Sequence, residues 1–520
     1  MSAAVASFSL RKLLLASVLL GAGLAWLLYR ANRAFGDFFA DEGYLWYGVQ
    51  RVLAGEVPLR DFMSYEIGRY YLVAALLAPF GANGLLALRA ALAVFAGLSL
   101  ALCTGVVGYH WRESRVSRLI PVAVLFALWL VPRHKVFDIA ICAVLVLAVY
   151  RLFLRPGASR CFQWGLAVGI AAVIGQNHGF YGLLASVLAF AWLWRAERAA
   201  PRLSWLAACA AGVVVGYLPV LGFALFVHGF AQAEWSALHY LLVEYKGTNL
   251  PLPVPWPWLT WPRWPAIGWT QALGSLFFVG LPVALAAAGL RLWRRGDRAG
   301  SPLAAAAWVI ALPYANVAFS RADISHLAQA LLPFLLLGLA LFAPASRSGI
   351  RRLAVPVLLL LVSLPVALVL QPRHAALTAQ ADLQQVEVLG DKVMVSRRAA
   401  SVLALAASQG EGRPVLAVPV YPGLDAAFGM RSPTWGIFPL FPRKPDFERQ
   451  EIARIEADPP ALVLVAQGGV DRRPDLAYPA THPLTYRYVV DHFDRIPSPV
   501  KGLEAYEART GTGTATPPVR

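Results

Sequence analysis

Charged residues are scarce in this chain, and their scarcity limits what kind of protein it is. Only 14% of the 520 residues are Asp, Glu, Lys or Arg, and 58% are hydrophobic. In a typical soluble globular protein about a quarter of the residues are charged. Apolar runs long enough to cross a bilayer recur over the first three quarters of the sequence. The composition therefore excludes an ordinary soluble protein and predicts a polytopic membrane protein.

Cysteine is rare as well, and its distribution excludes two kinds of site. The four cysteines lie in or beside apolar runs, at Cys103, Cys142, Cys161 and Cys209. Their spacing is not that of a metal site, and it offers no disulfide outside the membrane. We expect each of them to be a small buried hydrophobic residue.

Lysine is also uncommon, so that most of the 46 basic residues are arginines. A net charge of +17 would indicate a nucleic-acid partner in a soluble protein. Here most arginines lie in short loops between apolar runs, where the orientation of a membrane protein accounts for them. We therefore expect these positive charges to interact with the lipid bilayer, and we expect no nucleic-acid partner.

The apolar runs predict about 11 membrane-spanning helices. These runs are residues 13–29, 85–109, 119–131, 136–154, 162–174, 180–194, 205–227, 271–292, 303–319, 327–342 and 353–370. No small-residue cleavage site follows the first run, which favours a retained anchor over a signal peptide. Residues 70–80 are too short to cross and are expected to be interfacial or re-entrant.

Loops rich in arginine alternate with loops poor in it, and this alternation predicts the orientation of the protein in the membrane. The loops assigned to the cytoplasm hold Arg112, Arg115, Arg118, Arg151, Arg155, Arg160, Arg195, Arg198, Arg202, Arg291, Arg294, Arg295, Arg298, Arg347, Arg351 and Arg352. By the positive-inside rule the N-terminus is cytoplasmic, while residues 31–84 and everything after residue 370 are outside. We expect a multi-pass protein of the inner (plasma) membrane.

The chain after residue 370 has the composition of a soluble protein. Strand-like runs occupy residues 415–418 and 461–465, and helical patterns occupy 379–408 and 446–457. This alternation predicts a small extracytoplasmic α/β domain over residues 371–507. Residues 508–520 are rich in Gly, Thr and Pro and are predicted to be a disordered tail. The predicted fold class is thus mainly α, a membrane helical bundle over residues 1–370 with a C-terminal α/β domain.

Two adjacent acids, Asp41 and Glu42, open a short amphipathic segment in the first outer loop. Carboxylates close to lipid are costly, so their presence requires a reason. One reason is catalysis, because a carboxylate accepts the proton of an acceptor hydroxyl as that hydroxyl attacks an anomeric carbon. The other is helix capping, since acids favour the first turn of a helix. The two roles are compatible.

The basic residues of the outer loops are candidates for binding phosphate: Arg60, Arg69, Arg133, His134 and Lys135. Arginine binds phosphate oxygens bidentately, and lysine binds them as a point charge. The alternative is that these residues are interfacial anchors whose charged ends reach the headgroups. Asp61 either contacts a sugar hydroxyl or, as we prefer, pairs with Arg60. Tyr65, in the aromatic run that follows, is a further candidate for substrate binding.

Two later outer segments are candidates for contacts with a sugar or a phosphate. The first holds His178 and Tyr181, and the second holds Arg321, Asp323 and His326. Residues 323 and 326 would share one face of a helix. A lone histidine is more often structural than functional. A His/Asp pair without a third ligand is weak evidence for a metal, and we predict none.

The first outer loop resembles that of the GT-C superfamily of polyprenyl-phosphate-sugar glycosyltransferases. This superfamily includes protein O-mannosyltransferases and the lipid A aminoarabinose and galacturonic acid transferases. The resemblance rests on Asp41-Glu42 after the first span, a Tyr-rich helix, and a Gly-x-x-Pro-x-x-Asp-Phe element at residues 55–62. It covers residues 1–370, is strongest over 38–89, and includes the segments 177–181 and 321–326. A soluble domain after the last span is similar to the family plan.

The resemblance implies an integral membrane glycosyltransferase, either a hexosyl- or a pentosyltransferase. It would move a sugar from a polyprenyl-phosphate donor to an envelope acceptor (lipid, glycan or protein) on the outer face. Asp41 would be the catalytic base, with Glu42 beside it, and Arg69 would contact the donor phosphate. No cofactor or metal would be needed. The Pro-Pro of the family pattern is replaced here by Gly68-Arg69, which leaves the acceptor class open.

Three other functions remain as alternatives. A transporter or lipid-carrier flippase would place ionisable residues at the midplane of its spans and would have broken helices. Here the charges cluster at the outer ends of spans, and no internal repeat is evident. A ligase-type enzyme of the same superfamily would use a lipid diphosphate-linked glycan, and the paired acids modestly disfavour it. An inactive scaffold is disfavoured by the intact Asp41-Glu42 pair.

Overall fold

The computed structural model describes residues 8–197, 202–247, 249–295, 301–342, 349–378, 382–410 and 412–509. Every apolar run predicted to span the membrane forms a helix. These helices are α1 (Leu10–Asn32), α4 (Leu85–Trp111), α5 (Val116–Leu128), α6 (Val136–Leu154), α7 (Ala158–Ile174), α8 (Gln176–Glu197), α9 (Leu203–Phe226), α13 (Trp269–Arg295), α14 (Pro302–Ser320), α15 (Ile324–Phe342) and α16 (Gly349–Ala367). The predicted membrane helical bundle is thereby confirmed.

The helices of the bundle differ in length and in hydropathy. Within the described residues, 8 helices are long and apolar enough to cross a membrane. α5 and α7 are apolar but shorter, and α8 is not among the 8. The 13 residues of α5 rise by only about 20 Å, whereas a bilayer core is about 30 Å thick. The chain is an integral membrane protein, but only some of the predicted helices have the length and the composition of a membrane span.

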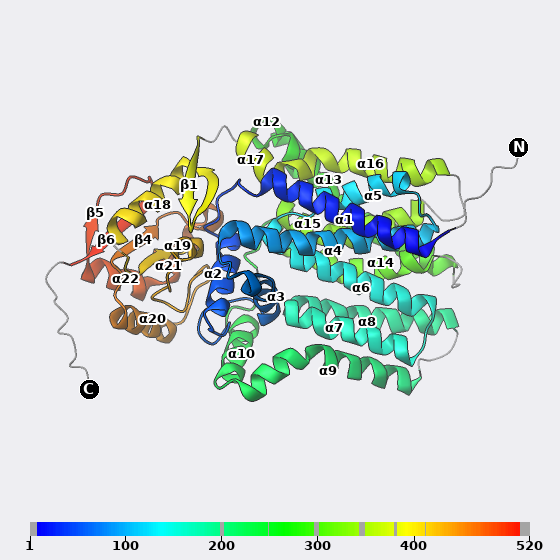
Figure 1. Cartoon of the computed structure of the whole chain (residues 1–520), viewed down its shortest axis with the longest axis horizontal. Coiled ribbons are helices and arrows are strands. Elements are labelled where there is room, and N and C mark those ends of the chain that lie inside the picture. The colour runs from blue at the N-terminus through cyan, green and yellow to red at the C-terminus, as the bar shows by residue number, and fades with distance from the viewer. Residues whose placement is uncertain are drawn as a thin grey trace, which may run out of the picture.

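The two ends of the bundle differ in what they carry. Figure 1 shows consecutive long helices running in opposite directions, with the N-terminus at one end and the C-terminal sheets at the other. The short helices α2 (Asp41–Leu53) and α3 (Ile67–Leu77) lie at the end that carries the sheets (Figure 1). The arginine-bearing ends of α4, α6 and α13 lie at the opposite end. The predicted alternation of the loops therefore agrees with the fold.

Short elements connect the long helices. They are η1 (Ala78–Phe80), η2 (Arg133–Lys135), α10 (Phe230–His239), η3 (Tyr240–Glu244), α11 (Pro257–Thr260), η4 (Trp261–Arg263), α12 (Trp264–Ile267), η6 (Leu368–Leu370) and α17 (Pro372–Thr378). Among them, η2 brings Arg133, His134 and Lys135 to the sheet end of the bundle, and the turn between α14 and α15 brings Arg321 there.

Small residues allow the helices to pack closely. Gly165 and Gly169 of α7 face Gly212 and Gly216 of α9, and both pairs have the GxxxG spacing. A Cβ atom at Gly165 would lie 2.0 Å from the carbonyl oxygen of Cys209. In lipid, where apolar surface has little to gain from association, such close backbone contact holds helices together by van der Waals packing.

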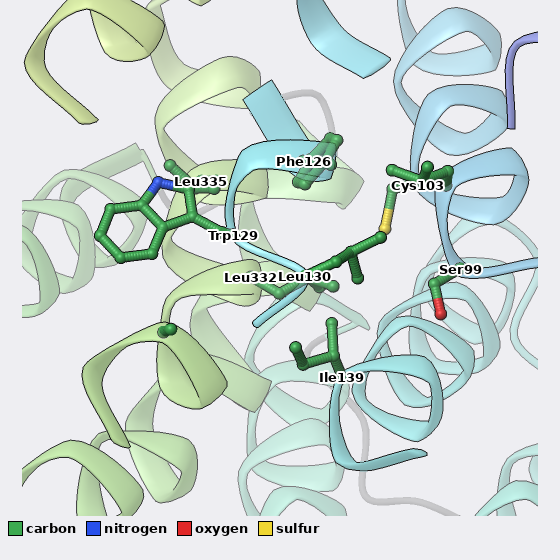
Figure 2. Close-up of a pocket in the computed structure, with 10 residues that line it drawn as sticks. Ser99, Cys103, Phe126, Trp129, Leu130, Ile139, Leu332 and Leu335 are labelled. Carbon is green, nitrogen blue, oxygen red and sulfur yellow. The ribbon is translucent and has the colours of Figure 1, made fainter. Parts of the chain in front are cut away.

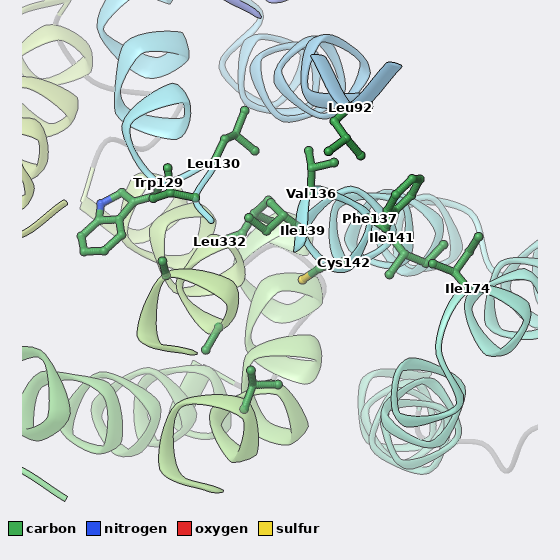
Figure 3. Packing of buried hydrophobic residues seen from close by; sticks show 14 of the residues in the cluster. Leu92, Trp129, Leu130, Val136, Phe137, Ile139, Ile141, Cys142, Ile174 and Leu332 are labelled. Atoms are coloured by element: carbon green, nitrogen blue, oxygen red, sulfur yellow. The ribbon is translucent and has the colours of Figure 1, made fainter. Parts of the chain in front are cut away.

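Larger apolar side chains fill the centre of the bundle. Figure 3 shows the packing around the start of α6, where Phe137, Ile139 and Cys142 meet residues of neighbouring helices such as Leu92 and Leu332. All four cysteines are buried, as the sequence predicted. This core holds the outer ends of α4, α6 and α15 in fixed positions relative to one another.

The C-terminal part is an α/β fold, as predicted. One sheet has the strand order β3-β4-β6-β5, in which only β3 and β4 are parallel. Its strands are β3 (Val415–Val418), β4 (Leu462–Ala466), β5 (Phe493–Ile496) and β6 (Leu503–Ala508). The helices and helical turns around it are α18 (Arg397–Gly410), α19 (Pro422–Phe428), α20 (Pro445–Ala457), η7 (Val470–Arg472), η8 (Pro474–Leu476), α21 (Tyr478–Thr481) and α22 (Pro483–His492).

The helix predicted over residues 379–408 is wrong in its first half. Residues 383–396 form an antiparallel hairpin of β1 (Leu383–Val388) and β2 (Asp391–Ser396), and only α18 is helical. The turn residues Leu389 and Gly390 both have positive φ, which a helix does not accommodate. Valines alternate along both strands, a pattern typical of a half-buried sheet. The tail from residue 510 lies outside the described residues, and the domain boundaries stay predictions.

The sheet domain is joined to the bundle through its hairpin and through α19. Met394 of β2 accepts a backbone hydrogen bond from Gly36 and donates one to Ala34, in the α1–α2 link. Gly423 of α19 lies so close to Gly43 of α2 that a Cβ on Gly43 would approach its Cα to 2.3 Å. The domain is therefore packed directly over α2.

We expect the sheet domain and the arginine-bearing ends to lie on opposite sides of the membrane. Asp446→Cys, on the exposed start of α20, should react with a membrane-impermeant maleimide in right-side-out vesicles. Ser117→Cys, on the exposed first turn of α5, should react only after permeabilisation. The four native cysteines are buried and give a low background. Labelling of both positions in sealed vesicles would contradict the predicted orientation.

Candidate active site

The candidate site lies where α2 begins, between the bundle and the sheet domain. Asp41 and Glu42 form the first turn of α2, after Ala40 as the N-cap. Neither acid caps the helix through a side-chain hydrogen bond, but their charges favour the positive end of the helix dipole. Successive residues of a helix point about 100° apart, so the two carboxylates face different surroundings.

Glu42 is held in a buried cluster of two arginines. Its side chain is 6% exposed, and its oxygens lie 2.7 Å from Nη2 of Arg89 and 2.6 Å from Nε of Arg133. Burial by itself would raise the pKa of Glu42, but Arg133 and Arg89 lower it to about 2. Since the ordinary pKa is 4.5, this pairing contributes stability above pH 4.5 that is lost as the pH falls toward 2.

The two arginines also hold the chain that leads from α1 to α2. Arg89 donates hydrogen bonds to the carbonyl oxygens of Arg33 and Gly36. Arg133 donates to the carbonyl oxygens of Asn32 and Phe35. We call Glu42, Arg89 and Arg133 the Glu42 clamp. Because its hydrogen bonds are used within the fold, the clamp positions α2 and leaves Glu42 no free oxygen for a substrate.

Asp41 has the opposite surroundings. It is half-buried, and its carboxylate has neither a hydrogen bond nor an ion pair among the described residues. Burial would raise the pKa of Asp41, but the electrostatic influence of four neighbouring side chains lowers it below its ordinary value. These are His134 and Lys135 of η2, and His326 and Arg321 at the α14–α15 turn. The arrangement keeps an unpaired carboxylate ionised at neutral pH.

Tyr65 and Lys135 form the wall beside Asp41. Lys135 Nζ donates a hydrogen bond of 3.2 Å to the Tyr65 hydroxyl and lies 4.4 Å from the centre of its ring. The ring of Tyr44 packs edge-on against Tyr65. Within the described part of the chain, Lys135 has no carboxylate at ion-pair distance, so its charge is available to an anionic ligand.

Arg69 is buried and already bonded. Its guanidinium is 3.5 Å from Asp138 and 3.7 Å from Glu66, and it donates to the carbonyl oxygen of Ile174. Asp138 in turn lies 2.6 Å from Nε2 of His178. The phosphate contact of Arg69 stays a prediction, and the partners of its guanidinium favour a structural role.

His178 is likewise part of a buried chain of contacts. Its Nδ1 lies 2.8 Å from the hydroxyl of Tyr314, and the side chain is 2% exposed. Sequence reasoning missed Asp138 and Tyr314, which complete this chain. An acid inside a predicted span, as Asp138 is, was the available signal, because such residues require partners.

Of the other predicted residues, Arg321, Asp323 and His326 form one group, and Tyr181 lies with Asn316. Arg321 makes a bidentate ion pair with Asp471 of the sheet domain and lies 3.2 Å from Asp323, which also contacts His326 at 3.0 Å. This group borders Asp41 and ties the bundle to the sheet domain. Tyr181 accepts a hydrogen bond from Asn316.

Arg60 and Asp61 pair with each other at 2.8 Å, as preferred from the sequence. Asp61 also accepts a hydrogen bond from the backbone of Val57, so it stabilises the turn of the Gly-x-x-Pro-x-x-Asp-Phe element. Arg60 reaches the carbonyl oxygen of His228, at the α9–α10 turn. These two residues are not among the groups whose charge acts most strongly on Asp41.

An internal cavity elsewhere in the bundle offers no chemistry. Figure 2 shows it between α4, α5, α6 and α15, lined by apolar side chains such as Phe126, Leu130 and Ile139. Ser99 contributes a hydroxyl group to the lining, and this hydroxyl donates a hydrogen bond to the carbonyl oxygen of Phe95. Among the described residues, no three His, Cys, Asp or Glu side chains are grouped so that they could hold a metal ion.

Comparisons with known proteins find similarity among solved structures only. No family model and no curated protein matches the chain. Among solved structures, ArnT from Cupriavidus metallidurans bound to undecaprenyl phosphate is 13% identical, with 96% of this chain and 98% of that chain covered and a TM-score of 0.49. The apo oligosaccharyltransferase of Archaeoglobus fulgidus is 11% identical, with 98% and 76% covered and a TM-score of 0.47.

The same oligosaccharyltransferase tethered to an acceptor peptide is 11% identical, with 96% of this chain and 74% of that chain covered and a TM-score of 0.46.

Replacing Glu42 should destabilise the protein, because it would leave Arg89 and Arg133 buried without their shared acid. Removing one partner of a buried ion pair typically costs about 3–5 kcal/mol. We expect Glu42→Gln to lower the unfolding temperature in detergent clearly, while Asp41→Asn leaves it unchanged. Thermal unfolding followed by tryptophan fluorescence would measure both. A stable but inactive Glu42→Gln protein would instead place Glu42 in the chemistry.

Proposed function

We propose that the protein is a glycosyltransferase that moves a sugar from a polyprenyl-phosphate-linked donor to an envelope acceptor on the outer face of the membrane. The observation that carries the proposal is the state of Asp41. Its carboxylate is ionised, is unpaired among the described residues, and lies near the cations Lys135 and Arg321 of two other elements, at the end of the bundle covered by the sheet domain. The proposal includes hexosyl and pentosyl donors, and lipid, glycan or protein acceptors.

In the proposed reaction Asp41 is the general base. The acceptor hydroxyl transfers its proton to the Asp41 carboxylate, and the acceptor oxygen forms a bond to the anomeric carbon. The bond between that carbon and the phosphate oxygen breaks, and its electron pair leaves with the polyprenyl phosphate. The negative charge on the leaving phosphate grows during this step, so fixed cations stabilise the transition state.

Lys135 is the residue proposed to hold the donor phosphate. It lies beside Asp41 and, within the described residues, is not neutralised by an acid, unlike Arg69 and Arg133. The predicted contacts of His134, Tyr65, Arg321, Asp323 and His326 belong to the same site. We propose a reaction without a metal cofactor, with Lys135 as the counter-charge of the phosphate.

The transporter alternative has less support in the positions of the charges. Arg89 lies in the first two turns of α4, and Asp138 lies in the first turn of α6. Both positions are at the sheet end of the bundle rather than at its middle (Figure 1). Both side chains are also ion-paired. Their placement favours a site at one membrane face over a path through the bilayer.

Asp41→Asn should abolish transfer without loss of stability, because the amide keeps the size of the side chain but cannot accept the proton. A general base typically contributes about 10²–10⁴-fold in rate. The measurement is transfer of radiolabelled sugar from synthetic polyprenyl-phosphate donors to membrane acceptors, with and without EDTA. Asp446→Asn, on an exposed turn of the sheet domain, is the matched control. Retention of more than about a tenth of the turnover would contradict the assignment.

Removing the charge of Lys135 should change the pH dependence in a defined direction. Lys135 lowers the pKa of Asp41, so Lys135→Met should raise that pKa and move the acid limb of kcat/KM to higher pH. The activity lost at low pH should return as the pH rises, although the maximum stays reduced by weaker donor binding. Lys392→Met, on the exposed hairpin, should leave the limb in place. If the acid limb lay at the same pH in both variants, Lys135 would have no influence on the pKa of Asp41, and the assignment would be contradicted.

A further inference from the structure

A second pocket lies at the sheet end of the bundle, beside the Glu42 clamp. It is formed by α1, α4, the turn before α6 and the start of α17, and its volume is about 540 Å³ including its open mouth. We call it the α1 pocket. Arg89 and Arg133 line it, whereas Asp41 does not. It is therefore a different site from the one proposed for catalysis.

The α1 pocket is polar at its outer end and apolar in its depth. Tyr29, Asn32 and Arg33, at the end of α1, lie at the polar end together with Gln371. Towards the middle of the bundle the lining consists of small and aliphatic side chains, among them Ala93 and Ala96 of α4. Ala25 of α1 faces these alanines, so that small side chains from two helices line this part of the pocket.

The wall towards the lipid is α1 itself. This helix packs mainly on α4, and its outward side chains Leu15, Leu19 and Leu27 are more than 60% exposed. In a bilayer these side chains would contact acyl chains. A lipid molecule next to α1 could therefore reach the pocket from the membrane, at the depth of the headgroups.

Spare positive charge surrounds the mouth of the α1 pocket. Arg33 lies over the ring of Tyr29, and Arg373 of α17 lies over the ring of Phe35. Neither guanidinium has a carboxylate at ion-pair distance among the described residues. In addition, the Glu42 clamp carries a net positive charge, because one carboxylate is paired with two arginines. Arginines at this end are not explained by the positive-inside rule, which places them at the other end.

We propose that the α1 pocket binds an anionic phospholipid of the outer leaflet. Its phosphate lies against Arg33 and Arg373, whose planar forks suit phosphate oxygens, and one acyl chain enters the pocket and lies against Ala93 and Ala96 of α4. The pairing of an apolar groove with unpaired arginines at headgroup depth favours this ligand over a free anion or a neutral lipid. The site is independent of the proposed glycosyl transfer, since no part of it includes Asp41.

Native mass spectrometry of the detergent-purified full chain tests the proposal. The probes are phosphatidylglycerol, phosphatidylcholine and undecaprenyl phosphate, each added separately and then in competition. We expect phosphatidylglycerol to bind in preference to phosphatidylcholine. Arg33→Gln should weaken its binding by about tenfold, the usual loss for one charged hydrogen-bonding contact. Ala93→Leu, which fills the groove without changing the charge, should weaken it as well.

Arg30→Gln is the matched control, because Arg30 lies one turn away on α1, has the same charge and does not line the pocket. It should bind phosphatidylglycerol as the unaltered protein does. Equal losses in Arg30→Gln and Arg33→Gln would reduce the effect to general surface charge and overturn the proposal. So would equal binding of phosphatidylcholine, or preferential, Arg33-dependent binding of undecaprenyl phosphate. Asp41→Asn should bind phosphatidylglycerol normally, which separates this site from catalysis.

Discussion

The architecture of the site depends on one buried interaction, the pairing of Glu42 with Arg89 and Arg133. Three charged groups removed from water are tolerated only when their geometry is good and their remaining hydrogen bonds are satisfied. Both conditions hold, because the arginines also donate to the carbonyl oxygens of residues 32–36. The clamp therefore joins α1, α2, α4 and η2, which are far apart in sequence. The start of α2 is fixed by it.

Fixing Glu42 determines the position of its neighbour. The helix turns by about 100° per residue, so a Glu42 directed at α4 leaves Asp41 directed elsewhere, among the cations of η2 and the α14–α15 turn. One acid thus holds the backbone, and the other is free to react. A reactive group on a rigid helix, supported by a buried ion pair, meets the positional demand of catalysis better than one on a mobile loop.

The sequence predicts the elements of this fold better than their contacts. Apolar runs indicate the helices, and the alternation of arginine indicates which ends lie together, because both depend on local composition. The hairpin at residues 383–396 was mistaken for a helix because its decisive feature, the positive φ at Leu389 and Gly390, leaves little trace in composition. The partners of Glu42 were not predictable either, since Arg89 lies 47 positions away inside an apolar run.

Most of the arginines that the sequence offers for phosphate binding are already paired with carboxylates of the protein itself. Arginine has five donors in a planar fork, so a single buried side chain can satisfy a carboxylate and several carbonyl oxygens together. Arg69 and Arg133 both do so. Lysine has a compact charge on a flexible stem and cannot hold such a network. For that reason Lys135, whose ammonium is bonded among the described residues only to the Tyr65 hydroxyl, keeps a charge that a ligand can use. A count of basic residues in an outer loop therefore overstates the positive charge available to a substrate.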